Sequence, residues 1–169
     1  SRFVRPERLA EIIFIPLSDR RPARRPWGAT RRKQEPLMPK MIFVNLPVSD
    51  LARSTAFYQA IGGEKNRQFS DDTGSCMVFS ETIYAMLLTH DKFRQFTPKQ
   101  IADARTSTEV LICLSADSRG AVDDMVGKAQ GAGGGADPGP KQDYGFMYGR
   151  SFEDPDGHRV VFQNVSWPA

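Results

Sequence analysis

The residues best able to bind a metal or move a proton are concentrated near the C-terminus, in the stretch FEDPDGH. Within six positions this stretch offers four such side chains: Glu153, Asp154, Asp156 and His158. A calcium loop needs alternating oxygen ligands closed by a glutamate about 12 residues on, and no glutamate follows here. Pro155 and Gly157 are instead typical of a tight turn, because proline presets φ and glycine accepts positive φ. We therefore predict a turn and not a metal site.

The elements that must position this turn follow a repeated order. The first half predicts a strand over 41–48, a capped helix over 49–63, and strands over 64–69, 75–80 and 83–89. The second half predicts a strand over 108–116, a helix over 117–134, a loop or edge strand over 136–142, and strands over 144–152 and 158–165. The helix starts at Asp50 and Asp117 lie about 67 residues apart, which indicates an internal duplication of a β-α-β-β-β unit.

Charge and composition change abruptly near residue 38. Residues 1–37 carry a net charge of +6, whereas the rest of the chain carries −3. Because the first segment is rich in arginine and proline and poor in apolar residues, we predict a disordered basic arm or a non-native N-terminal extension. Nucleic acid or an acidic surface could be contacted only through this arm.

The remaining residues, 38–169, are predicted to form a single domain. Its first module covers 38–90, its linker 91–107 and its second module 108–166. No apolar stretch reaches the roughly 18 residues of a membrane span, so we predict no membrane contact. Cys76 and Cys113 both lie in apolar strand patterns, where a buried free thiol is typical of a reducing compartment, and we predict a cytoplasmic protein.

Several motifs occur in the order found in a known superfamily. MIFVNLPVSDLARSTAFYQAIG, MLLTHDKF and GFMYGRSFEDPDGH resemble glyoxalase/bleomycin-resistance-type proteins of the vicinal oxygen chelate superfamily, some of which are called predicted lactoylglutathione lyases. The resemblance covers about residues 38–166. It implies an α+β fold in which two tandem βαβββ modules form a cupped, mostly antiparallel sheet.

The resemblance also implies where a divalent metal would be held in metal-dependent members. Four ligands would come from the first and last strands of each module, at Phe43, at Leu111, at Val161 and within IYAMLL. All of these positions are apolar or aromatic, and metal ions in proteins need nitrogen, oxygen or sulfur donors. We therefore expect no cofactor, with a divalent metal only as the alternative.

Strand alternation indicates which side chains line the cup, and two more residues could reach its rim. The predicted ligand-binding residues are Phe43, Asn45, Met86, Glu109, Leu111, Cys113, Tyr148, Arg150, Val161 and Gln163. Arg159 falls on the same predicted face. Glu109 is the only proton-transfer candidate there, and its catalytic role would need a partner that the pattern does not provide.

Three functions follow from these patterns. The first is a metal-free protein that binds or sequesters a hydrophobic, amphipathic or aromatic small molecule in an apolar cup, built where two copies meet as a homodimer. The second is an enzyme like lactoylglutathione lyase or a dioxygenase, using a divalent metal or an unrelated acid and base. The third is an interaction protein that uses residues 1–37. We favour the first.

Overall fold

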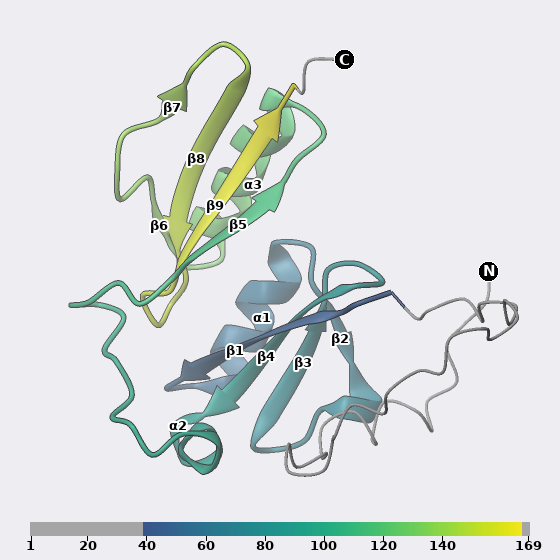
Figure 1. Cartoon of the computed structure of the whole chain (residues 1–169), viewed down its shortest axis with the longest axis vertical. Helices are drawn as coiled ribbons and strands as arrows, with labels where there is room; N and C mark the ends of the chain where they lie inside the picture. The colour runs from purple at the N-terminus through teal and green to yellow at the C-terminus, as the bar shows by residue number, and fades with distance from the viewer. Residues whose placement is uncertain (1–38, 167–169) are drawn as a thin grey trace, which may run out of the picture. The chain divides into compact units, whose positions relative to one another are not determined.

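The computed structural model describes residues 39–166, so the predictions for residues 1–37 lie outside the described part. Figure 1 shows two strand-and-helix units joined by a linker. The first unit, module one, contains β1 (Ile42–Val48), α1 (Leu51–Ala60), β2 (Glu64–Asn66), the 3-10 turn η2 (Arg67–Phe69), β3 (Gly74–Val78) and β4 (Ile83–Thr89). The linker contains α2 (His90–Phe93) and the 3-10 turn η3 (Arg94–Phe96). Module two contains β5 (Leu111–Ser115), α3 (Arg119–Gly131), β6 (Gly135–Ala136), β7 (Gln142–Asp143), β8 (Met147–Glu153) and β9 (Arg159–Val165).

Both modules have the same sheet topology. The strand order is β1-β4-β3-β2 in module one and β5-β9-β8-β6 in module two, with β7 pairing with β8. Among the described residues only β1 with β4 and β5 with β9 run parallel; they are the first and last strands of each module, connected through the helix and the other strands. The predicted α+β fold of two duplicated, mostly antiparallel modules is confirmed, and β1 and β5 each leave one edge unpaired within their sheets.

Short polar side chains start both long helices. The Asp50 side chain caps α1 by accepting a hydrogen bond from the backbone N–H of Arg53 at 3.0 Å. The cap of α3 is Ser118, whose hydroxyl accepts from the N–H of Ala121 at 3.1 Å. The expected acidic start at Asp117 is therefore wrong by one residue.

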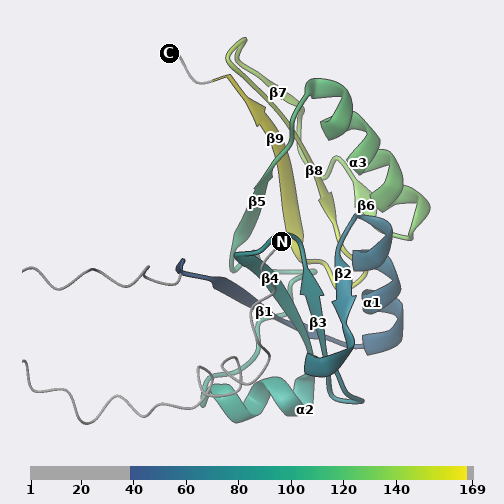
Figure 2. The same ribbon diagram turned by 90° about the vertical axis from the view of Figure 1, so that its right-hand side faces the viewer.

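The helices share one apolar core with the sheets. In Figure 2, α1 and α3 lie on the same side of the two sheets. Phe57 of α1 and Phe152 of β8 are both buried, and their rings meet edge-to-face with centroids 5.8 Å apart. Each module therefore contributes an apolar aromatic ring to the contact that joins them.

Three local predictions differ from the structure. Residues 67–69 form a 3-10 turn and not a strand, because the Asn66 side chain accepts from the N–H of Gln68 and turns the chain. Residues 108–110 lie outside β5, because its partner β9 begins only opposite Leu111. Cys113 is exposed on β5 and not buried, whereas Cys76 is buried as expected.

Candidate functional site

The stretch FEDPDGH forms the predicted turn between β8 and β9. Gly157 has a φ of +96°, and its N–H donates to the carbonyl of Asp154 at 3.0 Å. One oxygen of the Asp154 side chain accepts from the N–H groups of Asp156 and His158. The carboxylate therefore closes its own turn, which is the role expected for aspartate in such sequences.

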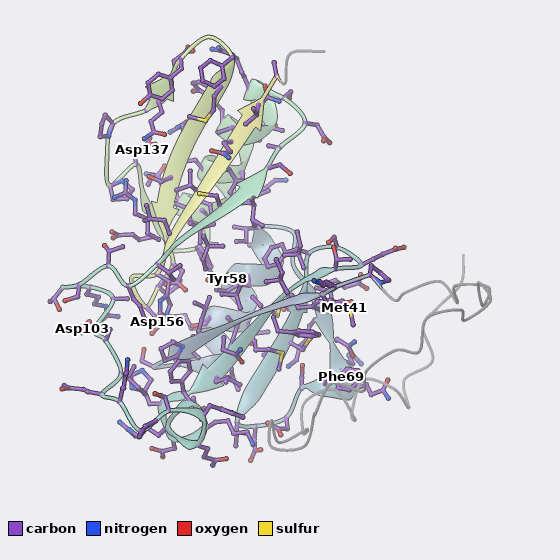
Figure 3. The ribbon with its side chains drawn as sticks, viewed as in Figure 1. Met41, Tyr58, Phe69, Asp103, Asp137 and Asp156 are labelled. Atoms are coloured by element: carbon purple, nitrogen blue, oxygen red, sulfur yellow. The ribbon has the colours of Figure 1, made fainter. Side chains whose placement is uncertain are left out.

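The second carboxylate of the turn contacts module one. Asp156 Oδ1 accepts from the N–H of Ser49 at 2.9 Å and from its hydroxyl at 2.5 Å. Asp156 Oδ2 accepts from the Ser54 hydroxyl at 2.7 Å. Figure 3 labels Asp156 and Tyr58, which lie where the two modules meet. Asp154 and Asp156 therefore do not converge on one point: Asp154 accepts hydrogen bonds within its own turn, and Asp156 accepts them from module one.

Two further contacts complete this connection. The Tyr58 hydroxyl donates to Asp154 Oδ2 at 3.0 Å in a buried position. His158 Nε2 lies 2.8 Å from the carbonyl oxygen of Pro47 at the end of β1. We call Asp154, Asp156 and His158 with these module-one partners the module clasp.

The clasp changes the ionisation of its acidic groups. Burial raises the pKa of Asp154, although the nearby charge of His158 and the hydrogen bonds to the carboxylate oppose this. Burial and the neighbouring Asp154 carboxylate raise the pKa of Tyr58 well above its ordinary value. Burial acts against ionised Asp156, but hydrogen bonds from Ser49 and Ser54 outweigh it and hold the pKa of Asp156 below its ordinary value.

We expect Asp156→Asn to lower the free energy of unfolding by about 1.5–3 kcal/mol at pH 7, because charge-assisted hydrogen bonds are lost from a side chain only 7% exposed. The folded-state pKa of Asp156 lies below its unfolded value. Its stabilising effect is therefore complete at neutral pH and is lost as the pH falls below about 4. Urea denaturation at pH 7 and pH 3 should show the difference between wild type and variant shrinking at the lower pH.

The control is Asp124→Asn on the exposed face of α3. We expect it to change the free energy of unfolding by less than about 0.5 kcal/mol at either pH. Asp154 contributes to pH dependence in the opposite sense, since its raised pKa means that the folded state binds the proton more tightly. This contribution is present in both proteins compared, so the difference isolates Asp156. A difference independent of pH would contradict the assignment.

The sheet faces opposite the helices carry the positions where the resemblance placed metal ligands. In module one, Phe43 pairs with Tyr84 and Asn45 with Met86 across β1 and β4. The rings of Phe43 and Tyr84 stack with centroids 4.7 Å apart. We call this side of each sheet the open face, because the helix and most of the core lie on the other side.

Module two presents a corresponding set. Leu111 of β5 lies opposite Arg159, and Cys113 lies opposite Val161 on β9. Ser115 lies opposite Gln163 in the same register. The structure therefore places Leu111, Cys113, Val161 and Gln163 on the open face of one sheet, as strand alternation predicted.

These residues do not fit a divalent metal. The positions in question are Phe43, Leu111, Val161 and the strand IYAMLL, none of which provides a carboxylate, imidazole or thiolate. Divalent zinc, nickel and manganese are held by imidazole, carboxylate or thiolate groups. Within residues 39–166 no cluster of three or more histidine, cysteine, aspartate or glutamate side chains is arranged to hold a metal. We derive no chemical step through a metal at this face.

Polar groups on the open face are few but distinctive. The Nη2 of Arg159 donates to the Ser151 hydroxyl at 3.2 Å. The buried Nε of the same side chain has no hydrogen-bond partner among the described residues. Glu153 is its register partner, yet no ion pair joins the two. Arg159 was placed on this face by alternation but left out of the predicted ligand-binding set. The sequence could not show that the Nε of Arg159 would be buried without a hydrogen-bond partner among the described residues.

Glu109 lies in the connection before β5 and not on a strand. It lines a small cavity of about 90 Å³ together with Asn45 and Arg159. The structure thus brings together two predicted polar residues from different modules. Glu109 has no hydrogen bond or ion pair to a second acid or base in this cavity among the described residues.

Tyr148 and Arg150 lie on the opposite side of module two and not at the rim. Arg150 forms ion pairs with Asp123 of α3, at 2.8 Å, and with Asp137, and these hydrogen bonds raise its pKa further. The Tyr148 hydroxyl donates to the same Asp123 at 2.8 Å. Strand alternation explains this placement, because positions 148 and 150 have the same parity as Phe152, which packs against the helices.

The cavity of about 90 Å³ reaches the open face at Asn45 and Arg159. Another cavity beside the clasp, of about 500 Å³, is lined by the linker and the β8–β9 turn. A third cavity lies along the end of α1 and β2. Phe43, Leu111 and Val161 line none of these three cavities, so their sharing of one ligand cavity stays a prediction.

Comparison with known proteins agrees with this architecture. Residues 40–79 match a family model described as bleomycin resistance protein-like N-terminal. A hypothetical protein from S. aureus is 26% identical, with 76% of this chain and 95% of that chain covered and a TM-score of 0.64. A glyoxalase/bleomycin resistance protein/dioxygenase family enzyme from Burkholderia phytofirmans is 20% identical, with 75% and 99% covered and a TM-score of 0.62.

A fosfomycin resistance protein from Listeria monocytogenes is more distant, with 18% identity, 79% and 96% coverage and a TM-score of 0.56. No match was found among the curated proteins. The fold is that of the glyoxalase/bleomycin resistance/dioxygenase proteins. The resemblance to the vicinal oxygen chelate superfamily is confirmed, with module one matching its bleomycin-resistance-like model.

Within the described residues, no helix combines the length and apolar character that crossing a bilayer requires.

Proposed function

We propose that this protein binds an apolar or aromatic small molecule at the open face without using a metal. One observation carries the proposal: the positions where the resemblance implies metal ligands are Phe43, Leu111, Val161 and the strand IYAMLL, which offer no carboxylate, imidazole or thiolate. Such side chains exclude water and favour apolar ligands, and methionine adapts its shape to irregular ones. The ligand is amphipathic in our proposal, since Asn45 and Arg159 offer polar contacts beside the apolar group.

A second copy of the chain completes the site in this proposal. Leu111 is 51% exposed, which is unfavourable for an apolar side chain unless something covers it. Two more apolar residues are exposed nearby: Ile42 on the unpaired edge of β1, and Val110 just before β5. A homodimer that covers these strands would enclose the open face and protect the strand edges from other pairings.

The binding test uses N-phenyl-1-naphthylamine, an uncharged aromatic amine whose fluorescence rises in apolar surroundings. We expect saturable binding, weakened roughly tenfold or more by Leu111→Asp because a carboxylate opposes burial of an apolar ring. The matched control is Phe96→Asp, which alters a comparably exposed apolar residue of the linker, 60% against 51% for Leu111. Absence of saturable binding, or equal weakening by both variants, would overturn the proposal.

The metal alternative is tested in parallel by thermal denaturation with Ni²⁺, Zn²⁺ or Mn²⁺. A ligand present at 100 times its dissociation constant stabilises a protein by about 2.7 kcal/mol, which raises the melting temperature of a domain this size by several degrees. Because the open face lacks suitable donors, we expect no saturable increase. A near-stoichiometric increase would show that other residues hold a metal.

A further inference from the structure

The cavity beside the module clasp has a chemical character different from that of the open face. We call it the junction cavity. It encloses about 500 Å³ between the end of β1, the linker and the β8–β9 turn, within the range of small-molecule sites. Both histidines of the chain, His90 and His158, line it. The open-face residues Phe43, Leu111 and Val161 do not.

The walls of the junction cavity are fixed by direct contacts. Arg105 Nη2 donates to the carbonyl of Pro155 at 3.0 Å, which holds the linker against the turn. A Cβ atom added at Gly157 would lie 2.9 Å from the backbone of Ala104 and Arg105, so linker and turn are in close contact there. Asp156 joins the turn to Ser49 on the other side. The cavity is therefore formed before any ligand binds, which reduces the entropy lost on binding.

Positive groups outnumber negative ones around this cavity. Its cations and imidazoles are His90, Arg94, Lys99, Arg105 and His158. Its carboxylates are Asp103 and Asp156, both labelled in Figure 3.

Both carboxylates are already hydrogen-bonded to the protein. Asp156 accepts from Ser49 and Ser54, and Asp103 accepts from the N–H of Arg105 at 3.1 Å. Asp156 also lies 3.7 Å from Arg53, which pairs its charge, whereas Asp103 keeps its negative charge. Arg94 is ion-paired with Asp91, whereas Lys99 and Arg105 have no ion pair among residues 39–166. The uncompensated charge at the cavity is positive.

We propose that the junction cavity binds a small anion carrying a phosphate or carboxylate group. Lys99 and Arg105 supply charge, and the His90 imidazole can donate a hydrogen bond. Lysine and arginine are the usual partners of such groups, and the imidazole side chain can donate to them. This site is separate from the open face, so it stands whether or not the proposed aromatic ligand is bound there.

The test is isothermal titration of the full chain with inorganic phosphate, pyrophosphate and succinate at constant ionic strength. We expect saturable binding of at least one of them with one site per chain. Phosphate or pyrophosphate binding without succinate binding would identify a phosphate site, and the reverse would identify a carboxylate site. Lys99→Met should weaken the binding roughly tenfold, since it removes one charge-assisted contact.

Two variants separate a specific site from general attraction. Lys128→Met removes the same charge from the exposed face of α3 and should leave the affinity unchanged. His90→Gln keeps a polar side chain at the cavity wall without the imidazole and should weaken binding severalfold. No saturable binding by any of the three anions, or equal loss in Lys99→Met and Lys128→Met, would overturn the proposal. Binding of N-phenyl-1-naphthylamine by the same samples reports independently on the open face.

Discussion

Phe57→Ala is expected to lower the free energy of unfolding by about 3–5 kcal/mol, the usual loss when a buried phenylalanine is truncated. Phe57 is 1% exposed and contacts Tyr58 as well as Phe152 of module two. The cavity cannot close easily, because Gly134 also approaches this ring: a Cβ atom there would lie 2.7 Å from Phe57. At this chain length the melting temperature should fall by roughly 10 °C or more.

The control for this substitution is Phe96→Ala, which removes the same atoms from a ring that is 60% exposed and should cost less than about 0.5 kcal/mol. Guanidinium denaturation, followed by far-UV circular dichroism and by near-UV circular dichroism of the tyrosines, measures both. Because Phe57 belongs to a core shared by the modules, we expect the two signals to change together. Two separate transitions in the wild type would contradict the shared core.

Gly157→Ala is expected to destabilise the protein by about 2–5 kcal/mol for two reasons. Its φ of +96° disfavours any residue with a Cβ atom, and that atom would lie 2.9 Å from the backbone of Ala104 and Arg105. Backbone atoms cannot yield as a flexible side chain can. The linker would have to move away from the β8–β9 turn.

Gly62 provides a matched control, because it has the same φ of +96° and no atom within 4 Å of an added Cβ. Gly62→Ala should therefore cost only the conformational strain, about 1–2 kcal/mol. The difference between the two variants, measured by urea denaturation, gives the contribution of the linker contact. Equal losses would mean that the linker does not constrain the turn. Anion titration of Gly157→Ala would then also be expected to match the wild type.

Most of the architecture could be predicted from the sequence, because it follows from local patterns. The apolar alternation in β1 and the helix with Asp50 at its start both depend on neighbouring residues. The repeat of these patterns after residue 108 then predicts the second module. The errors occur where tertiary partners decide the outcome: Glu109 lies outside β5 because its neighbour strand has not yet begun.

The candidate sites were less predictable. Alternation correctly placed Phe43, Leu111 and Val161 on the faces opposite the helices, since it needs only the strand direction. The side to which Tyr148 points depends on the alternation of side chains along β8. The prediction that it reaches the rim of the cup was wrong. The junction cavity was not predicted at all. Its histidines are 68 positions apart, and only the folding of the linker over the turn brings them to one cavity.

The module clasp also bears on how a duplicated chain diverges. The β8–β9 turn docks two carboxylates on α1, at Ser54 in its first half and at Tyr58 near its end. In the corresponding β3–β4 turn, the Ser80 hydroxyl contacts its own turn and accepts from the N–H groups of Thr82 and Ile83. The two repeats are therefore no longer equivalent: one provides the docking acids and the other the hydroxyls that receive them. A chain assembled from two copies of either repeat would therefore lack the hydrogen bonds from the Ser54 and Tyr58 hydroxyls to the two carboxylates.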